Sequence, residues 1–333
     1  METVLLTGAT GYLGGYVISE LKEHDYNIIA IGRNKKRGQE LESLGCKFYQ
    51  TDFADEARMR DIFNENKIDY VIHTGALSSA WGAYDDFYHC NVEGTEIIAG
   101  LCVENDVKRM VYISSPSVYC AKRDRLDIKE EDVDEANEMN YYIKTKIISE
   151  QRLRMLVEKG LKVTILRPRA LIGKGDPSLM PRLMRANKKI GIPLFNKGKN
   201  YVDVTCVENV AYACLLAMKK DVASGSVYNI TNGEPHEFKE ILEKFCVAAS
   251  QKPKFLALPF PLIYGVASML EWMNKTFHMK SEPVLTKYTV CTLAFSQTLC
   301  LDKARNELGY EPKLSLEEGV KNYGIWWSKN SGN

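Results

Sequence analysis

One glycine-rich stretch near the start of the chain, residues 4–15, constrains the fold most. An apolar run that suits a buried strand leads into a turn with Gly8, Gly11 and Gly14, and a helical pattern follows. Gly8 permits a tight turn, Gly11 lets the backbone approach a phosphate, and Gly14 lets the helix pack close to its strand. Ordinary turns also use glycine. The preceding strand and the amphipathic segment at 12–21 are what favour a pyrophosphate-binding turn.

Short apolar segments alternate with helical patterns through the first half of the chain. After the first strand, the expected strands are residues 27–31, 47–50, 70–73, 109–114 and 163–167. This alternation predicts an α/β fold with a doubly wound, Rossmann-like parallel sheet. The ligands of such a sheet lie beyond the carboxyl ends of its strands.

The pattern changes after residue 173. Residues 177–203 leave the sheet, a helix at 207–218 and a strand at 227–230 return to it, and the chain from residue 234 is mostly helical. We therefore expect two domains that interleave along the chain. The dinucleotide-binding domain comprises residues 1–172 and 204–232, and a smaller, mostly helical substrate domain comprises residues 173–203 and 233–333.

The composition argues against several function classes. The 44 Lys and Arg residues nearly balance the 43 Asp and Glu residues, so the charge gives no reason to expect nucleic acid as a partner. Nine cysteines are scattered without a Cys-x-x-Cys pair or a metal-like spacing to the five histidines, so we expect no metal site. This cysteine usage and the lack of a leader before the first strand favour a cytoplasmic location.

The end of the second expected strand bears on the choice of cofactor. A fold that prefers NAD normally has a carboxylate here for the ribose hydroxyls, whereas this chain has Arg33, Asn34 and further basic residues. A guanidinium suits a 2'-phosphate through a forked, charge-assisted pair. NADP(H) is therefore favoured, with NAD(H) as the alternative and a solvated basic loop as the competing explanation. Asp52 and Phe53, after the third strand, are expected near the adenine.

Hydroxyl, phenol and ammonium groups gather after the fifth strand. Ser115 and Ser117 follow this strand, and Tyr142 and Lys146 have an i, i+4 spacing that places them on one helix face. Tyrosine titrates near pH ~10 and is a poor base at neutrality unless a cation stabilises its phenolate. Lys146 can supply that charge and bond the nicotinamide ribose. For this pair alone, a solvated helix face is the commoner explanation.

Several motifs occur together in a fixed order. They are Thr7-Gly8-Ala9-Thr10-Gly11-Tyr12-Leu13-Gly14, Asn91-Val92-Glu93-Gly94-Thr95, Ser115 and Tyr142-x-x-x-Lys146. Their combination resembles the extended short-chain dehydrogenase/reductases, and the resemblance covers nearly the whole chain. Residues 81–88, 202–210 and 296–310 are similar to the 3-beta-hydroxysteroid dehydrogenase branch. That branch also holds sterol-4-carboxylate decarboxylating dehydrogenases and 3-keto acid reductases of long-chain olefin synthesis.

The resemblance implies a role for each site residue. Tyr142 would be the general acid/base, Lys146 its cationic partner, and Ser115 the hydroxyl that orients the reacting oxygen. His73 would support the cofactor loop rather than act as a base. The expected cofactor-binding residues are Gly8, Thr10, Gly11, Tyr12, Leu13, Gly14, Arg33, Asn34, Asp52, Phe53, Thr74, Gly75, Ala76, Asn91, Tyr142, Lys146, Pro168 and Leu171. The expected substrate contacts are Ser78, Trp81, Ser117 and Arg169.

The resemblance also implies a function. We expect an NAD(P)-dependent dehydrogenase or reductase that acts on a small hydrophobic substrate, at the 3-position of a steroid, sterol or bile acid. A second copy of the chain, in a homodimer, is a further expected partner. A 3-keto fatty-acid-type reductase is an alternative. A non-catalytic dinucleotide-binding regulator is another, and the intact catalytic set speaks against it.

A nucleotide-sugar epimerase is the main alternative from outside lipid chemistry. Sugar enzymes of this family carry an Asn after the sixth strand and a diphosphate-binding Arg further on. This chain has Arg167-Pro168-Arg169 at the first place and Val202-Asp203 at the second. Arg169 could replace the missing phosphate ligand, so the alternative stays open.

One apolar segment, residues 255–273, allows three interpretations. Two prolines and a glycine interrupt it, whereas a spanning helix needs about 20 mainly apolar residues without such breaks. The segment could be a core helix, a wall or lid over an apolar substrate, or a helix that lies on a membrane surface. A wall would bring Leu262 and Trp272 against the substrate.

Overall fold

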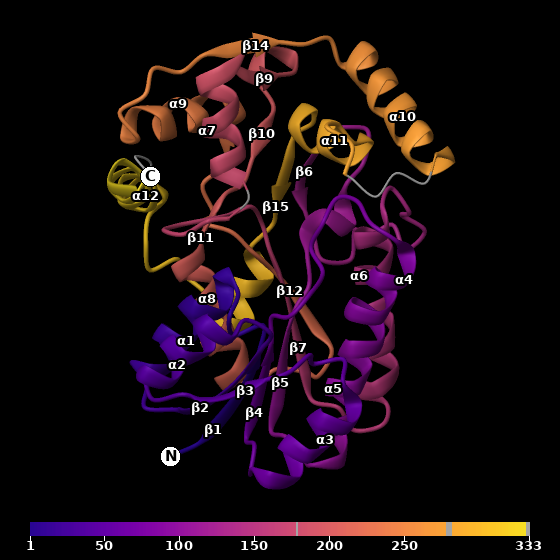
Figure 1. The fold of residues 1–333 in the computed structure, drawn as a ribbon, viewed down its shortest axis with the longest axis vertical. Coiled ribbons are helices and arrows are strands. Elements are labelled where there is room, and N and C mark those ends of the chain that lie inside the picture. The colour runs from indigo at the N-terminus through magenta and orange to yellow at the C-terminus, as the bar shows by residue number, and fades with distance from the viewer. Residues whose placement is uncertain (178, 278–281, 331–333) are drawn as a thin grey trace.

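The computed structural model describes residues 1–177, 179–277 and 282–330, and its central element is a parallel sheet (Figure 1). Seven strands lie in the order β12-β7-β5-β4-β1-β2-β3. Their bounds are β1 (Thr3–Thr7), β2 (Asn27–Gly32), β3 (Lys47–Gln50), β4 (Tyr70–His73), β5 (Arg109–Ile113), β7 (Val163–Pro168) and β12 (Ser226–Ile230). All neighbouring pairs are parallel. The predicted doubly wound sheet is confirmed, and its order reverses between β1 and β4, where such sheets bind ligands.

Helices cover both faces of this sheet (Figure 1). One face carries α1 (Tyr12–Lys22), α2 (Lys35–Ser43) and α8 (Val207–Lys219). The other carries α3 (Glu56–Glu65), α5 (Gly94–Glu104) and α6 (Tyr141–Val157). The apolar residues of these helices recur every three to four positions, so each helix buries one stripe against the strands.

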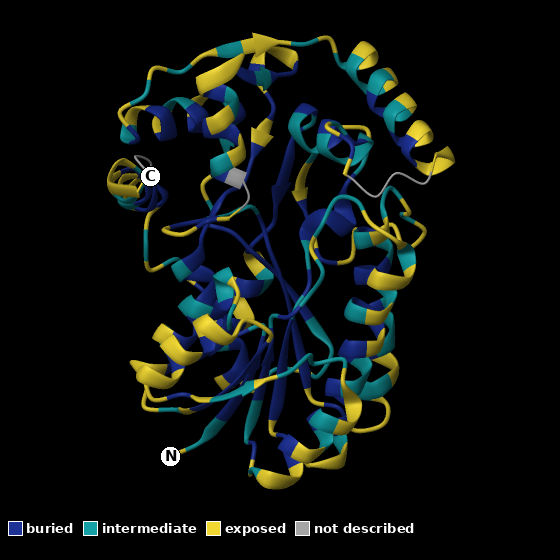
Figure 2. Ribbon diagram, in the orientation of Figure 1, coloured by how far each residue is buried: buried dark blue, intermediate teal, exposed yellow. Residues whose placement is uncertain are grey.

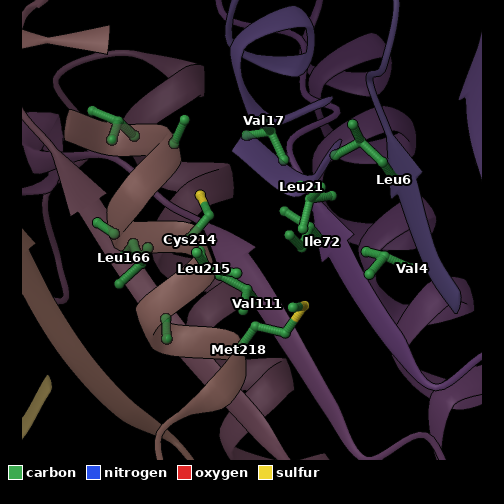
Figure 3. Packing of buried hydrophobic residues seen from close by; sticks show 14 of the residues in the cluster. Val4, Leu6, Val17, Leu21, Ile72, Val111, Leu166, Cys214, Leu215 and Met218 are labelled. Atoms are coloured by element: carbon green, nitrogen blue, oxygen red, sulfur yellow. The ribbon is translucent and has the colours of Figure 1, made fainter. Parts of the chain in front are cut away.

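Buried aliphatic side chains hold the helices on the sheet. In Figure 3, Val17 and Leu21 of α1 and Leu215 of α8 lie in one cluster with Leu6 and Val111 of the strands. Each of these side chains is at most 3% exposed, and full burial of one such side chain stabilises the fold by about 1.5–3 kcal/mol. This packing fixes the positions of the strand ends from which the site is built.

A smaller body lies beyond the carboxyl ends of the parallel strands (Figure 1). Its helices are α7 (Leu179–Lys189), α9 (Phe238–Ala248), α10 (Phe260–Thr276), α11 (Lys287–Ala294) and α12 (Leu316–Asn330). Its strands are β6 (Arg125–Ile128), β8 (Leu171–Ile172), β9 (Ile192–Leu194), β10 (Tyr201–Val202), β11 (Thr205–Cys206), β13 (His236–Glu237), β14 (Phe255–Ala257) and β15 (Gln297–Leu299). Four of these strands form a sheet in the order β13-β10-β15-β6. The expected domain boundaries remain a prediction.

The smaller body is joined directly to the loop after β5. Strand β15 pairs with β6, and Gln297 Nε2 donates a hydrogen bond of 3.1 Å to the carbonyl of Pro116. The backbone N–H of Leu299 donates to the carboxylate of Asp203 at 2.7 Å. Segments that are about 100 to 180 positions apart along the chain therefore meet beside Ser115.

Helix α10 packs on the molecule along one side only. Ala267 is buried against α11, whereas Leu262, Met269 and Trp272 are 62%, 54% and 63% exposed. Figure 2 shows the exposed residues along this helix. The core-helix interpretation of residues 255–273 therefore holds for one side of α10, where Phe260, Ile263 and Tyr264 pack against buried clusters, and fails for the exposed side. No helix within the described ranges has the length and apolar character needed to cross a membrane.

Candidate active site

A cavity of about 1050 Å³ runs from the glycine turn of the sheet to the smaller body. Among the predicted site residues, it is lined by Gly8, Thr10, Gly11, Tyr12, Leu13, Gly14, Arg33, Asn34, Phe53, Thr74, Gly75, Ala76, Ser78, Ser115, Ser117, Tyr142, Lys146, Pro168, Arg169 and Leu171. We call the part of the cavity that is lined by the residues from Gly8 to Lys146 in this list the cofactor end. Of the predicted residues that the structure describes, Asp52, Trp81 and Asn91 are not in the lining.

The turn between β1 and α1 has the shape that a phosphate requires. Gly8 has a φ of +67°, and a Cβ at this position would lie 2.8 Å from the nitrogen of Gly75. At Gly14 a Cβ would lie 2.4 Å from the carbonyl oxygen of Gly8. Helix α1 begins after Gly11 without a side-chain cap, so its first amides and its positive end can receive an anion. These residues fit the pyrophosphate of a dinucleotide cofactor.

His73, at the end of β4, supports the turn between β1 and α1. Its Nδ1 lies 2.6 Å from Thr7 Oγ1 and its Nε2 lies 3.1 Å from Thr95 Oγ1. Burial, with the nearby charge of Lys146, lowers the pKa of His73 to about 3. The imidazole is therefore neutral at pH 7 and, as expected of a support, both of its nitrogens are used in bonds within the protein.

Asn91 lies behind the cavity wall and not in it. Its side chain accepts a hydrogen bond from the N–H of Leu77 at 2.8 Å and donates to the carbonyl of the same residue at 3.1 Å. It also donates to Thr145 Oγ1 at 3.1 Å. The amide of Asn91 thus joins the loop after β4 to α6, and the cofactor contact expected at this residue stays a prediction.

Arg33 and Asn34 lie at the cavity rim where β2 ends. The Arg33 side chain is 77% exposed, and its guanidinium lies 3.3 Å from Asp52. Such an exposed pair is worth about 1 kcal/mol or less, so Arg33 is free to exchange this partner for a ligand. Asn34 accepts from the N–H of Arg37 and caps α2. Asp52, expected near the adenine, instead pairs with Arg33 and accepts from the N–H of Ala54.

The start of α6 determines which way Tyr142 and Lys146 face. The Asn140 side chain accepts from the N–H of Ile143 at 2.8 Å and caps the helix. With this start, Tyr141 is 38% exposed while Lys146 is 1% exposed. The Nζ of Lys146 donates to the carbonyl of Ile113 at 2.8 Å and to the hydroxyl of Tyr112 at 3.1 Å. The ammonium is thereby anchored to β5 on the side of the cavity.

The two serines after β5 lie next to each other. Ser115 accepts from the N–H of Ser117 at the start of a short helix at 116–119, and the two hydroxyl oxygens are 2.5 Å apart. Burial raises the pKa of Tyr142, while the charge of Lys146 and a hydrogen bond with Ser115 lower it. Burial lowers the pKa of Lys146, and Tyr142 and Glu150 raise it. The pair can therefore pass a proton to or from an oxygen held by the serines.

The far end of the cavity, here called the substrate end, is mostly apolar. Its apolar lining residues are Ile172, Pro177, Met180, Leu183, Val202, Val204, Phe238, Ile241, Leu242, Phe245 and Leu293, and its polar ones are Asp176, Asp203, Tyr288 and Thr292, with Arg169 beside them. Most of these residues come from α7, α9 and α11. None of these residues except Arg169 was predicted as a site residue from the sequence, although the amphipathic patterns of α7 and α9 indicated that each helix buries one face.

Three aromatic or aliphatic residues expected at the substrate lie elsewhere. Lys275 of α10 lies 6.0 Å from the centre of the Trp81 ring, so Trp81 meets the end of α10 and not the cavity. Leu262 and Trp272 point outward from α10. The wall interpretation of residues 255–273 is therefore wrong for these side chains, because α11 stands between α10 and the cavity.

Comparisons with known proteins agree with this geometry. A model of the NAD dependent epimerase/dehydratase family matches residues 4–231. The 2-alkyl-3-oxoalkanoate reductase of Stenotrophomonas maltophilia is 30% identical over 325 residues, which cover 96% of this chain and 97% of the relative. The decarboxylating sterol-4-alpha-carboxylate 3-dehydrogenase of Schizosaccharomyces pombe is 30% identical over 337 residues, with 98% and 97% covered.

A solved structure shows the same fold. The UDP-glucose 4-epimerase of Thermotoga maritima superposes with a TM-score of 0.78 at 23% identity and covers 99% of both chains. At this identity the likeness concerns the fold alone. The match of the family model and the relatives at 30% identity, together with the glycine turn and the Tyr142-x-x-x-Lys146 pair, lead to one conclusion. The chain belongs to the NAD-dependent epimerase/dehydratase family, the extended short-chain dehydrogenase/reductases that its motifs predicted.

Proposed function

We propose that the protein is an NAD(P)-dependent oxidoreductase that interconverts a secondary alcohol and a ketone on a large hydrophobic substrate. One observation carries this proposal: the Ser115, Tyr142 and Lys146 set shares a cavity with an apolar substrate end. The 3-position of a steroid, sterol or bile acid is the favoured place of reaction. The sterol dehydrogenase among the relatives supports this choice.

Each catalytic side chain has a separate task in this reaction. A bound nicotinamide accepts or supplies the hydride. Ser115 orients the reacting oxygen, and Tyr142 receives the alcohol proton on oxidation and returns it on reduction. Lys146 stabilises the phenolate of Tyr142, since its ammonium is held near that ring by Ile113 and Tyr112. The apolar lining excludes water, which strengthens these charge interactions.

The lining favours a hydrocarbon skeleton over a sugar. Desolvating an unpaired sugar hydroxyl costs about 1–3 kcal/mol, whereas burying apolar surface gains about 25 cal/mol per Å². Leu183, Leu242 and Phe245 offer no hydrogen bond to a hydroxyl. These side chains take over the role that our sequence analysis assigned to residues 255–273.

We propose NADP(H) as the preferred cofactor. Arg33 is exposed at the end of β2, and the weak pair with Asp52 leaves it free for a 2'-phosphate. The family description and the solved relatives with bound NAD keep NAD(H) as the alternative.

A nucleotide-sugar epimerase is the second candidate, since Arg169 could hold a diphosphate and the fold is shared with such enzymes. The test is to mix the protein with NADPH or NADH and a panel of 3-keto steroids, 3-keto acids and UDP-sugars. Net oxidation of the cofactor by ketones supports the proposal. Interconversion of UDP-sugars without net redox change would replace it, and tight cofactor binding without turnover would indicate a regulator.

The exposed side of α10 supports a peripheral contact with a membrane surface, the third interpretation of residues 255–273. Leu262, Met269 and Trp272 are 62%, 54% and 63% exposed, and side chains of this kind insert at the boundary between headgroups and acyl chains. Such a contact would bring the enzyme to the place where hydrophobic substrates concentrate. Sedimentation with lipid vesicles tests it.

A further inference from the structure

Two buried arginines near the end of β7 differ in what surrounds them. Arg167 is 0% exposed, and its guanidinium is completely engaged. Its Nε donates to Glu150 at 2.9 Å, and its other nitrogens donate to Glu150, to the carbonyl of Glu130 and to the hydroxyl of Tyr119. This arginine is a structural connection between β7, α6 and the loop that follows β6.

Arg169 is almost as buried and lies in the cavity lining instead. It is 7% exposed. Its Nε has no hydrogen-bond partner among the residues that the structure describes. A buried guanidinium without a full set of partners costs several kcal/mol. Nε itself is shielded from the cavity, so a ligand would meet the guanidinium through its other two nitrogens, for which the described residues supply no hydrogen bond or ion pair.

Asp203 is the acidic group whose charge acts on Arg169, and it does not complete the pair. It is 1% exposed and accepts from the N–H of Leu299 at 2.7 Å. No ion pair within 4.0 Å joins it to Arg169 in the described part of the chain. Burial raises the pKa of Asp203 to about 6, although the hydrogen bond from Leu299 and the charge of Arg169 both lower it.

Arg169 lies in the same cavity as the catalytic hydroxyls. Tyr288 is an electrostatic neighbour of both Arg169 and Ser117, and all three residues line the cavity. Ser117 in turn touches Ser115. Arg169 thus lines the same cavity as Ser115 and Tyr142, so a substrate held by these hydroxyls can also present a charged group to the guanidinium.

We propose that Arg169 binds a carboxylate that the substrate carries on the carbon beside the reacting one. The substrate class is then a hydrophobic 3-oxo acid, or the corresponding 3-hydroxy acid. An arginine fork matches the two oxygens of a carboxylate. The inference rests on the proposed function and narrows it. A branched acyl chain and a sterol nucleus both offer this chemistry, and the names of two relatives contain one example of each.

The experiment compares substrates that differ only in the charge. Oxidation is followed with NADP⁺ or NAD⁺ for a 2-alkyl-3-hydroxyalkanoate and its methyl ester, and for a 4-carboxy-3-hydroxysterol and the same sterol without the carboxyl group. The variants are Arg169→Gln, Arg169→Lys and the control Arg60→Gln. Arg60 lies exposed on α3, where it pairs with Glu56 and Glu104. Thermal unfolding and NADPH titration monitor the fold and the cofactor site of each variant.

In one of the two substrate pairs, we expect the wild type to prefer the compound with the free carboxylate over its uncharged counterpart. The preference in kcat/KM should be about ten- to a hundredfold, the effect of one or two charge-assisted hydrogen bonds. Arg169→Gln should lose this preference mainly through KM and leave the ester or plain sterol unchanged. Arg169→Lys should restore part of it, and Arg60→Gln should match the wild type. The pair that is turned over identifies the acyl or the sterol source.

Several results would overturn the inference. If the wild type oxidises the ester or plain sterol as well as the acid, Arg169 binds no carboxylate, although the oxidoreductase proposal stands. An equal loss for acid and ester in a folded Arg169→Gln would make Arg169 structural. Should that variant fail to fold, the acid preference of the wild type and of Arg169→Lys decides. Turnover of UDP-sugars alone would refute the proposed function itself.

Discussion

The two ends of the cavity differ in how their polar groups are satisfied. At the cofactor end, His73 bonds Thr7 and Thr95, and Lys146 bonds the carbonyl of Ile113. At the substrate end, Arg169 is buried with a nitrogen that no described residue bonds. The first arrangement is preorganised and depends little on which ligand enters. The second is complete only with a ligand of matching charge, so specificity should reside there.

The largest expected effect breaks the cofactor end. Tyr142→Phe should lower turnover by about two to four orders of magnitude, because it removes the group that transfers the proton. Cofactor affinity should stay nearly unchanged. Steady-state kinetics and NADPH titration measure the two quantities. Tyr141→Phe is the matched control, since Tyr141 is the exposed neighbour on the same helix. Normal turnover in Tyr142→Phe would clear Tyr142 of this role.

The next effect concerns the rim of the cofactor end. Arg33→Asp should shift the ratio of kcat/KM for NADPH to that for NADH by about ten- to a hundredfold toward NADH, since repulsion replaces attraction at the 2'-phosphate. Arg58→Asp, on the exposed surface of α3, is a control of equal charge change. A wild type that already prefers NADH would refute the assignment of Arg33.

A smaller effect tests the apolar wall of the substrate end. Leu183→Asp should raise KM for a hydrophobic substrate by about tenfold or more and leave a small ketone unaffected, because a charge would face the buried skeleton. Leu183 is 8% exposed and lies in the lining. Trp272→Asp, which changes an exposed position on α10, should leave both KM values unchanged in the absence of membranes. The reverse pattern would restore the wall interpretation of residues 255–273.

The smallest expected effect is a pH dependence of stability. The folded state lowers the pKa of His73 from an ordinary 6.5 to about 3. The unfolded chain therefore binds the proton first, and stability falls by up to ~1.4 kcal/mol per pH unit as the pH drops below 6.5. The raised pKa of Asp203 acts with the opposite sign between 3.8 and about 6.

Urea unfolding of the wild type at pH 7 and pH 5 measures this dependence. His73→Asn should flatten the loss of stability on acidification, because the group that is protonated in the unfolded chain is gone. Asp203→Asn should make the loss steeper, because it removes the opposing contribution. An unaltered slope in His73→Asn would show that other groups govern the acid sensitivity.

Much of the fold and of the cofactor end could be predicted from sequence because local patterns determine them. The glycines at 8, 11 and 14 specify the turn, and the apolar runs gave the strand positions to within a residue or two. The i, i+4 spacing of Tyr142 and Lys146 also needs only one helix to bring them together.

The rest depends on contacts between distant segments. An amphipathic pattern shows that α7 and α9 each bury one face. It does not show that Leu183 and Phe245, from these two helices, line the same cavity. Apolar content alone could not show on which side α10 is covered. The pair of Asp52 with Arg33 also cannot be read from position along the chain, and the expected adenine contact of Asp52 stays a prediction. Trp81 was assigned to the substrate because its contact with α10 cannot be read in this way either.

The pairing of β15 with β6 affects the order in which the protein becomes active during synthesis. Pro116, which follows Ser115, accepts a hydrogen bond from Gln297, a residue 181 positions further along the chain. The strands up to β12 can assemble while the remainder is still being made, as domains commonly do on the ribosome. The catalytic loop reaches its final position only after residue 299 has emerged. A nascent chain should thus acquire its cofactor turn early and its chemistry last, and slow closure of such distant contacts sets the delay.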